Sequence, residues 1–303
     1  MILSGDEIMK NKQIALGCMR IANKSYEEVE SLIKCAIENN ISFFDHADIY
    51  GNRKCEEIFG EVIKNNPEIR DKIIIQSKCG ICNGYYDLSK EHIIKQVKES
   101  IRLLNCKYLD ILLIHRPDAL TNYDEINEAF TYLYENNLVK EFGVSNMNPY
   151  QIELYKKYVK YPIKHNQIQF SIVHSHIISQ GLFVNTSTSE AIDHSSGLLE
   201  YCQLNDIIIQ AYSPLMASWE KGSFIDHPEF VDVNNKLEEL ANKYNVSKNA
   251  IAIAFILRHP SNIIPIVGTT SITHLLEISK ALEVELTRKE WYELYLSAGH
   301  NLP

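Results

Sequence analysis

Two patterns of apolar residues alternate along this chain. Short runs that are apolar at nearly every position, such as residues 108–114, have the length of strands. Longer segments carry apolar residues three and four positions apart and predict amphipathic helices, as after Ser89, where Ile93, Val97 and Ile101 share one face. Eight strand-like runs separated by helices are predicted at 14–16, 41–44, 72–77, 108–114, 140–144, 163–170, 207–211 and 263–267.

The ends of the helices carry capping signals. Ser25 with Glu28, and Thr287 with Glu290, have the spacing of capping boxes, in which each side chain binds the other residue's backbone N–H. By contrast, residues 171–193 are rich in Ser, His and Thr and have no clear period, which predicts a long loop.

The strand-like runs are continuous rather than alternating, which is typical of a parallel sheet buried on both faces. Eight βα units in 303 residues predict one (β/α)8 TIM barrel domain over 1–303, with long loops at its C-terminal mouth at 171–193 and 216–230. An open doubly wound sheet is the alternative, but no strand is followed by a GxGxxG or Walker A segment.

Composition narrows the class of partner. A net charge of -9 with no Lys/Arg cluster argues against nucleic-acid binding. No apolar run approaches a membrane span, and residues 1–13 lack the features of a signal peptide. Seven scattered cysteines fit reduced thiols, so we expect a cytoplasmic protein without disulfides and without an evident obligate protein partner.

Polar and ionisable residues occur where the predicted strands end. In a closed parallel barrel these ends surround one mouth, where such enzymes place their chemistry. Asp45 and Tyr50, within FFDHADIYG, would suit proton transfer there, although each taken alone also fits a turn aspartate and a half-buried tyrosine. The residues at strand ends are Asp45, Lys78, His115, Ser145, Asn146, Tyr212, Ser213, Gly268, Thr269 and Thr270.

These motifs resemble the aldo-keto reductase superfamily over nearly the whole chain, from Gly17 to the last helix. FFDHADIYG, LLIHRPD, GVSN and GTTSITHL match in type, order and spacing, and DHADIYG with the ending WYELYLSAGHNLP is similar to bacterial oxidoreductases of the YdhF type. The resemblance implies reduction of a small aldehyde or ketone to an alcohol with NAD(P)H. The alternative is a regulatory subunit of the same fold that holds cofactor with little turnover.

The resemblance also implies residue roles. Tyr50 would be the proton donor, Lys78 paired with Asp45 would lie beside its phenol, and His115 would orient the substrate carbonyl. A nearby ammonium favours a phenolate, so we expect Lys78 to lower the pKa of Tyr50. No side chain can supply a hydride, and a nicotinamide cofactor is therefore expected.

The same correspondence implies a cofactor site. Ser145, Asn146 and Gln167 would bind the carboxamide, and Tyr212 would stack on the ring. The other residues implied to bind cofactor are Gly17, Met19, Asp45, Ser213, Pro214, Leu215, Gly268, Thr269, Thr270 and His274. Many relatives carry Lys or Arg in the pocket for the 2'-phosphate of NADP. Residues 268–274 of this chain include no Lys or Arg, so we expect NADP as the cofactor with NAD as an alternative.

Two further motifs are not expected to bind metal. Cys79 and Cys82 form a CxxC without a second pair or a matching histidine spacing, so zinc is not expected. No thioredoxin-like helix opens at this motif, so a redox role is not expected either. His174 and His176 lack an acidic partner nearby in sequence and are expected to line the substrate mouth instead.

Overall fold

The structure of the protein is a computed structural model, and it describes residues 12–303. The expectation drawn from residues 1–13 rests mainly on residues outside that range. Within it, the helices are too short or too polar to cross a membrane.

Eight parallel strands form a closed barrel in the order β1-β10-β7-β6-β5-β4-β3-β2, which confirms the predicted TIM barrel. The barrel strands are β1 (Ala15–Gly17), β2 (Phe43–Asp45), β3 (Ile74–Cys79), β4 (Leu109–Ile114), β5 (Val139–Ser145), β6 (Ile163–Gln169), β7 (Ile208–Tyr212) and β10 (Ile264–Val267). Most of their residues are buried, as expected for a parallel sheet that is covered on both faces.

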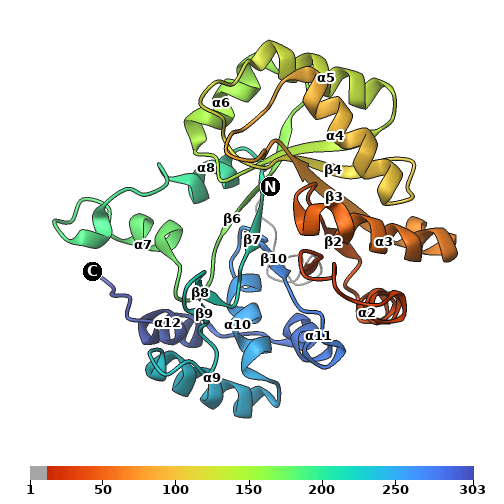
Figure 1. Cartoon of the computed structure of the whole chain (residues 1–303). Coiled ribbons are helices and arrows are strands. Elements are labelled where there is room, and N and C mark those ends of the chain that lie inside the picture. Colours follow the sequence, from red (N-terminus) through yellow and green to blue (C-terminus); the bar gives the residue numbers. More distant parts are fainter. Residues whose placement is uncertain (1–11) are drawn as a thin grey trace. The chain divides into compact units, whose positions relative to one another are not determined.

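The chain divides into two compact units. The first consists of residues 15–167 and 268–272, and its helices are α2 (Tyr26–Glu38), α3 (Lys54–Asn65), α4 (Lys90–Leu103), α5 (Tyr123–Glu135) and α6 (Pro149–Tyr158). Two 3-10 helices, η1 (Tyr50–Arg53) and η2 (Pro67–Lys72), also belong to it. Helices α4 and α5 pack side by side (Figure 1).

Strand register aligns the polar ends of the first three strands. Asp45, the last residue of β2, is opposite Gly17 of β1 and Gln76 of β3. Side chains that follow these strands therefore begin at the same edge of the sheet. The capping box of Ser25 and Glu28 fixes the start of α2 as predicted.

The second unit consists of residues 12–14, 168–267 and 273–303 of the described chain. Its helices are α7 (His176–Leu182), α8 (Leu198–Leu204), α9 (Val231–Tyr244), α10 (Lys248–Leu257), α11 (Ile272–Ser279), which starts at the unit boundary, and α12 (Arg288–Ser297). The short elements are β8 (Met216–Ser218), β9 (Gly222–Ser223), η3 (Ser189–Ala191) and η4 (Lys280–Glu283). The predicted box of Thr287 and Glu290 caps α12.

The prediction that residues 171–193 form a loop is wrong in part, because α7 and η3 lie within them. The hydroxyl of Ser175 donates to the carbonyl oxygens of Ser171 and Ile172, and Ile177 and Ile178 are buried. A helix of seven residues is too short to show a periodic pattern in the sequence. Likewise, the irregular segment 216–230 begins with the antiparallel pair β8–β9.

Candidate active site

Asp45 lies at the end of β2 with 2% of its surface exposed. Its carboxylate accepts hydrogen bonds from Lys78 Nζ at 2.7 Å, Gln76 Nε2 at 2.6 Å and Gln167 Nε2 at 3.1 Å. Three donors converge on this buried carboxylate, and their hydrogen bonds offset the free-energy cost of burying its charge. Gln76 was not predicted, since a glutamine inside an apolar run has no local sequence signal.

Lys78 connects this carboxylate to the phenol. Its ammonium donates to Asp45, to the carbonyl oxygen of His46 at 2.9 Å and to the hydroxyl oxygen of Tyr50 at 3.1 Å. Burial acts to lower the pKa of Lys78, but the interactions with Asp45 and Tyr50 outweigh it and the net pKa is raised. The lysine is therefore positively charged at neutral pH, with all three of its N–H donors engaged.

Tyr50 is placed by an unusual turn. The three residues after it, Gly51, Asn52 and Arg53, have φ angles of 55°, 51° and 69°, all in the left-handed region. A Cβ on Gly51 would lie 2.6 Å from the Cβ of Ala22, so only glycine fits there. The turn directs the chain from the barrel strand β2 into α3 and leaves the phenol beside Lys78.

The pKa of Tyr50 is raised, mainly by burial. Lys78 acts in the opposite direction, as predicted, but its effect is smaller than that of burial, and the predicted net lowering is wrong. Tyr50 consequently holds its proton throughout the neutral range. A protonated phenol is the form needed for carbonyl reduction, whereas alcohol oxidation would need the phenolate.

His115 follows β4, and its ring meets that of Tyr50 edge-on at a centroid distance of 6.2 Å. Burial, helped by Lys78 and Arg116, lowers the pKa of His115 to about 2, so the imidazole is neutral. Its Nδ1 is buried without a hydrogen-bond partner among the described residues. A neutral imidazole beside the phenol has the chemistry to hydrogen-bond an uncharged carbonyl oxygen.

Two further buried groups lie in the same segment and were not predicted. Burial lowers the pKa of His46 to about 3, and neither of its ring nitrogens has a partner within the described part of the chain. Burial raises the pKa of Asp48 to about 7, although Arg53 opposes this. The nearest Arg53 nitrogen is 3.9 Å from Asp48 because the guanidinium also bonds Glu56 and Gln96.

The first unit brings together part of the expected cofactor site. Asn146, at φ 54°, donates its backbone N–H to the carbonyl of Gln167 at 2.9 Å and its side-chain amide to Ser145 Oγ at 2.8 Å. Gln167 in turn reaches Asp45. The three predicted carboxamide ligands thus form one hydrogen-bonded chain that ends on the carboxylate paired with Lys78.

The expected phosphate loop belongs to the same unit and has a basic neighbour that the sequence analysis missed. Arg20, three residues beyond β1, donates from Nη1 to the carbonyl oxygen of Gly268 at 3.1 Å. Thr269 accepts from the backbone N–H of Ser271. Gly17 lies at the end of β1, and Met19 is 37% exposed. No local pattern links Arg20 to Gly268, which are 248 residues apart.

The remaining predicted cofactor ligands belong to the second unit. Tyr212 ends β7, and Ser213 follows it in a left-handed conformation with φ 52°. The turn of Ser213, Pro214 and Leu215 is closed by a bond from the Met216 N–H to the Ser213 carbonyl. His274 is exposed on α11.

The second unit also contains a group of imidazoles. His176 lies 5.0 Å from His174 and 4.8 Å from His194, measured between ring centroids. Nevertheless, within residues 12–303 no three His, Cys, Asp or Glu side chains are arranged to hold a metal ion. Burial lowers the pKa of His174 to about 4 and also lowers that of His176, so both rings are neutral.

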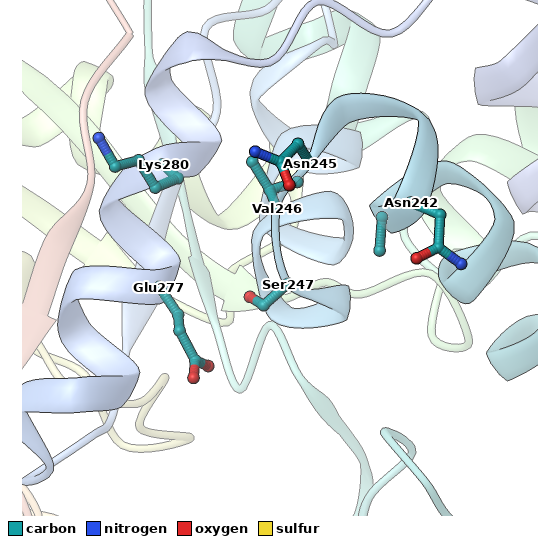
Figure 2. A pocket seen from close by; sticks show the side chains of 7 residues that line it. Asn242, Asn245, Val246, Ser247, Glu277 and Lys280 are labelled. Carbon is teal, nitrogen blue, oxygen red and sulfur yellow. The ribbon is translucent and has the colours of Figure 1, made fainter.

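A cavity of about 370 Å³ lies in the second unit between the end of α9, the start of α10 and α11 with η4 (Figure 2). Its lining consists of Ala241, Asn242, Asn245, Val246, Ser247, Glu277 and Lys280. Apart from Glu277 and Lys280 these are small, amide or hydroxyl side chains. Glu277 is bonded to Asn249, which leaves no arrangement of groups suited to carbonyl chemistry.

The closed parallel barrel defines the chain as a TIM-barrel α/β protein. Its sequence defines it further: the aldo/keto reductase family model matches residues 13–295, and the chain belongs to this family of oxidoreductases. It is 31% identical to oxidoreductase YdhF of Escherichia coli, over 93% of this chain and 91% of the relative. It is 32% identical to the 6-dehydroglucose reductase of Agrobacterium fabrum, over 94% of each protein.

Solved structures show the same fold. The thermostable aldo-keto reductase Tm1743, determined with the inhibitor epalrestat, is 25% identical and superposes with a TM-score of 0.74 over 94% of both chains. An aldo-keto reductase from Klebsiella pneumoniae, determined with NADPH, is 21% identical with a TM-score of 0.74, covering 93% of this chain and 89% of that one.

Proposed function

We propose that this protein reduces aldehydes or ketones to alcohols, with hydride from NAD(P)H and a proton from Tyr50. The observation that carries the proposal is the bonding of Lys78, whose buried ammonium contacts both the Asp45 carboxylate and the Tyr50 hydroxyl. Apolar side chains in place of the Asp45–Lys78 ion pair would stabilise the fold equally well, so stability does not explain the pair. Its contact with a phenol does suggest a use, which is proton transfer.

The chain's own groups divide the work. Tyr50 gives its proton to the carbonyl oxygen as negative charge develops there. Lys78 stabilises the phenolate that results, and Asp45 holds the lysine in place. His115, neutral and edge-on to the phenol, donates a hydrogen bond to the same oxygen and orients the carbonyl. Proton transfer and charge stabilisation at one oxygen are what this set of side chains supplies.

A nicotinamide cofactor, when bound, supplies the hydride that no side chain can provide. The donor set of the first unit fits such a group, since Ser145 and Asn146 offer hydroxyl and amide functions matched to a carboxamide. We propose that Gln167 joins them, that Tyr212 stacks on the ring, and that Gly268 to Thr270 and Ser213 to Leu215 hold the phosphates. Gly17, Met19 and His274 are proposed as further cofactor contacts, with NADP preferred to NAD.

For substrate, we propose a small carbonyl compound, and relatives guide the choice of test compounds. Two relatives are named 6-dehydroglucose reductases, at 32% and 27% identity. The test is NADPH consumption by the purified protein, with 6-dehydroglucose, simple aliphatic aldehydes, aromatic aldehydes and ketones as candidates. We expect turnover with at least one aldehyde and a much lower rate, by a factor of about 10² to 10⁴, with the Tyr50→Phe variant.

A second candidate function has one observation in its favour. A protein named as a probable voltage-gated potassium channel subunit beta, from Arabidopsis thaliana, is 26% identical over 85% of this chain. A regulatory role of that kind would require cofactor binding but little turnover. Tight NADPH binding without consumption for every carbonyl compound tested would therefore favour it over the reductase proposal.

We also propose that residues 1–303 act as one domain. The family model runs from residue 13 to residue 295 without a break, through both compact units. Unfolding in urea, followed by tryptophan fluorescence and by circular dichroism, should then give one coincident transition. Two separate transitions would contradict this.

A further inference from the structure

A second group of reactive side chains lies in the loop that follows β3. The loop is well ordered by backbone bonds: Cys82 N–H donates to the Tyr85 carbonyl at 2.9 Å, and Asp87 N–H donates to the Gly80 carbonyl at 3.0 Å. An isolated bridge also pairs Ile81 with Tyr86. This geometry fixes the position of Cys82, whose side chain is partly exposed.

The thiol of Cys82 faces an imidazole that is itself oriented by a carboxylate. Cys82 Sγ lies 3.9 Å from His92 Nε2, and His92 Nδ1 lies 3.4 Å from Asp87 Oδ2. The other Asp87 oxygen accepts the Ser89 N–H at 2.9 Å, and His92, in the first turn of α4, donates its N–H to Ser89 Oγ. Nucleophile, base and orienting carboxylate are therefore aligned through the two different nitrogens of one ring.

The protonation states of Cys82 and His92 favour a neutral imidazole that acts as a base over a thiolate–imidazolium ion pair. Burial lowers the pKa of His92, and burial likewise raises that of the Cys82 thiol. The pair at rest is a neutral thiol beside a neutral imidazole, which is ready to take the thiol proton. The charged groups that face His92 are Asp87, Lys95 and Arg53. The groups that face Cys82 are Asp87, Asp48 and the Tyr85 hydroxyl, which hydrogen-bonds the sulfur.

We propose that Cys82 is a nucleophilic thiol, assisted by His92 and positioned by Asp87, that forms mixed disulfides with small uncharged disulfides. His92 Nε2 takes the thiol proton as Sγ attacks one sulfur of the disulfide. The disulfide S–S bond breaks, a new S–S bond forms to Cys82, and the leaving thiolate takes the proton from the imidazolium. Cys82 is oxidised and the departing half is reduced to a thiol, so atoms and electrons balance.

The preference for an uncharged reagent follows from the acidic surroundings. Asp87 faces the sulfur and is ionised: burial acts to raise its pKa, but its hydrogen bonds to Ser89 and the neighbouring His92 outweigh burial and lower the pKa. An anionic disulfide would therefore meet repulsion. The other cysteines provide an internal comparison. Cys18, Cys55, Cys79 and Cys202 are buried, whereas Cys35 and Cys106 are partly exposed like Cys82. The sulfur of Cys35 has the amide of Asn39 beside it instead of an imidazole, and the thiol of Cys106 donates to the carbonyl oxygen of Ile101.

The test uses the full chain and 2-hydroxyethyl disulfide, with acid quenching and peptide mass spectrometry to follow Cys82 and Cys35 separately. We expect Cys82 to react about tenfold faster than Cys35, and His92→Gln to remove this advantage while leaving Cys35 unchanged. Asp87→Asn should reduce the Cys82 rate severalfold. Equal rates at the two cysteines, or a Cys82 rate unaffected by His92→Gln, would overturn the proposal.

The pH profile of the unmodified sequence tests the proposal without any variant. The rate at Cys35 should rise about tenfold per pH unit between pH 6.5 and 8, because it follows the thiolate fraction. Base assistance by an already neutral imidazole should make the Cys82 rate clearly less steep over that interval. Parallel profiles for the two cysteines would show that His92 does not act as a base. In that case Asp87 is only a structural residue of the loop.

Discussion

The ammonium nitrogen of Lys78 lies 3.1 Å from the hydroxyl oxygen of Tyr50, and the same nitrogen lies 2.7 Å from the carboxylate of Asp45. The phenol is thus in contact with a charge that is itself neutralised. This explains why burial outweighs the lysine in setting the pKa of Tyr50. The lysine matters most after the proton has left, when a phenolate is present for it to stabilise.

Removing the proton donor should separate binding from chemistry. We expect Tyr50→Phe to lower kcat by a factor of about 10² to 10⁴, because a general acid contributes that much. Cofactor affinity should change little, since the ring is kept. NADPH consumption measured beside a fluorescence titration with NADPH checks both quantities. A variant that kept a large fraction of the original kcat would show that another group donates the proton.

Removing the lysine should harm both activity and stability. Lys78→Met leaves Asp45 as an uncompensated buried charge, which costs about 3–5 kcal/mol of unfolding free energy. The double variant Lys78→Met with Asp45→Asn removes that charge and should recover most of the stability while remaining inactive. Urea unfolding and NADPH turnover of both variants check the two effects. Activity in the stabilised double variant would contradict the role of Lys78 in proton transfer.

The sequence allowed the barrel and the residues at strand ends to be predicted because both depend on local patterns. Asp45 ends β2, Lys78 is the last residue but one of β3, His115 follows β4, and Tyr50 lies in the turn after β2. Gln76 was missed because a polar residue inside such a strand reveals its partner only when β2 and β3 are paired. The pKa of Tyr50 was predicted in the wrong direction because burial is a property of the fold, not of the segment.

The buried carboxyl group of Asp48 should make stability fall with rising pH. Its pKa is raised from 3.8 to about 7, so its contribution to stability is full below pH 3.8 and is lost as pH rises through 7. Asp48→Asn lacks this ionisation. Relative to the parent protein, the variant should therefore gain about 2–3 kcal/mol between pH 5 and pH 8.

Urea unfolding of both proteins at the two pH values checks this, because other titrating groups cancel in the difference. Asparagine has nearly the same size and shape as the aspartate it replaces, and the neighbouring Arg53 would keep its bonds to Glu56 and Gln96. A stability difference that stayed constant between pH 5 and pH 8 would show that Asp48 is already ionised at pH 5.

The cofactor preference should depend on two basic residues in different ways. Arg20 is exposed and its guanidinium is bonded to the carbonyl of Gly268, at the start of the expected phosphate loop. We expect it to bind the pyrophosphate shared by both cofactors, so that Arg20→Gln weakens NADPH and NADH binding alike, by about tenfold.

His274 is the best group in residues 268–274 for the 2'-phosphate, and His274→Gln should weaken NADPH binding alone, severalfold. Kd values for both cofactors, measured for each variant, distinguish these effects, because only NADPH carries the 2'-phosphate. Loss of NADPH binding alone in Arg20→Gln would move the 2'-phosphate site to Arg20 and away from His274.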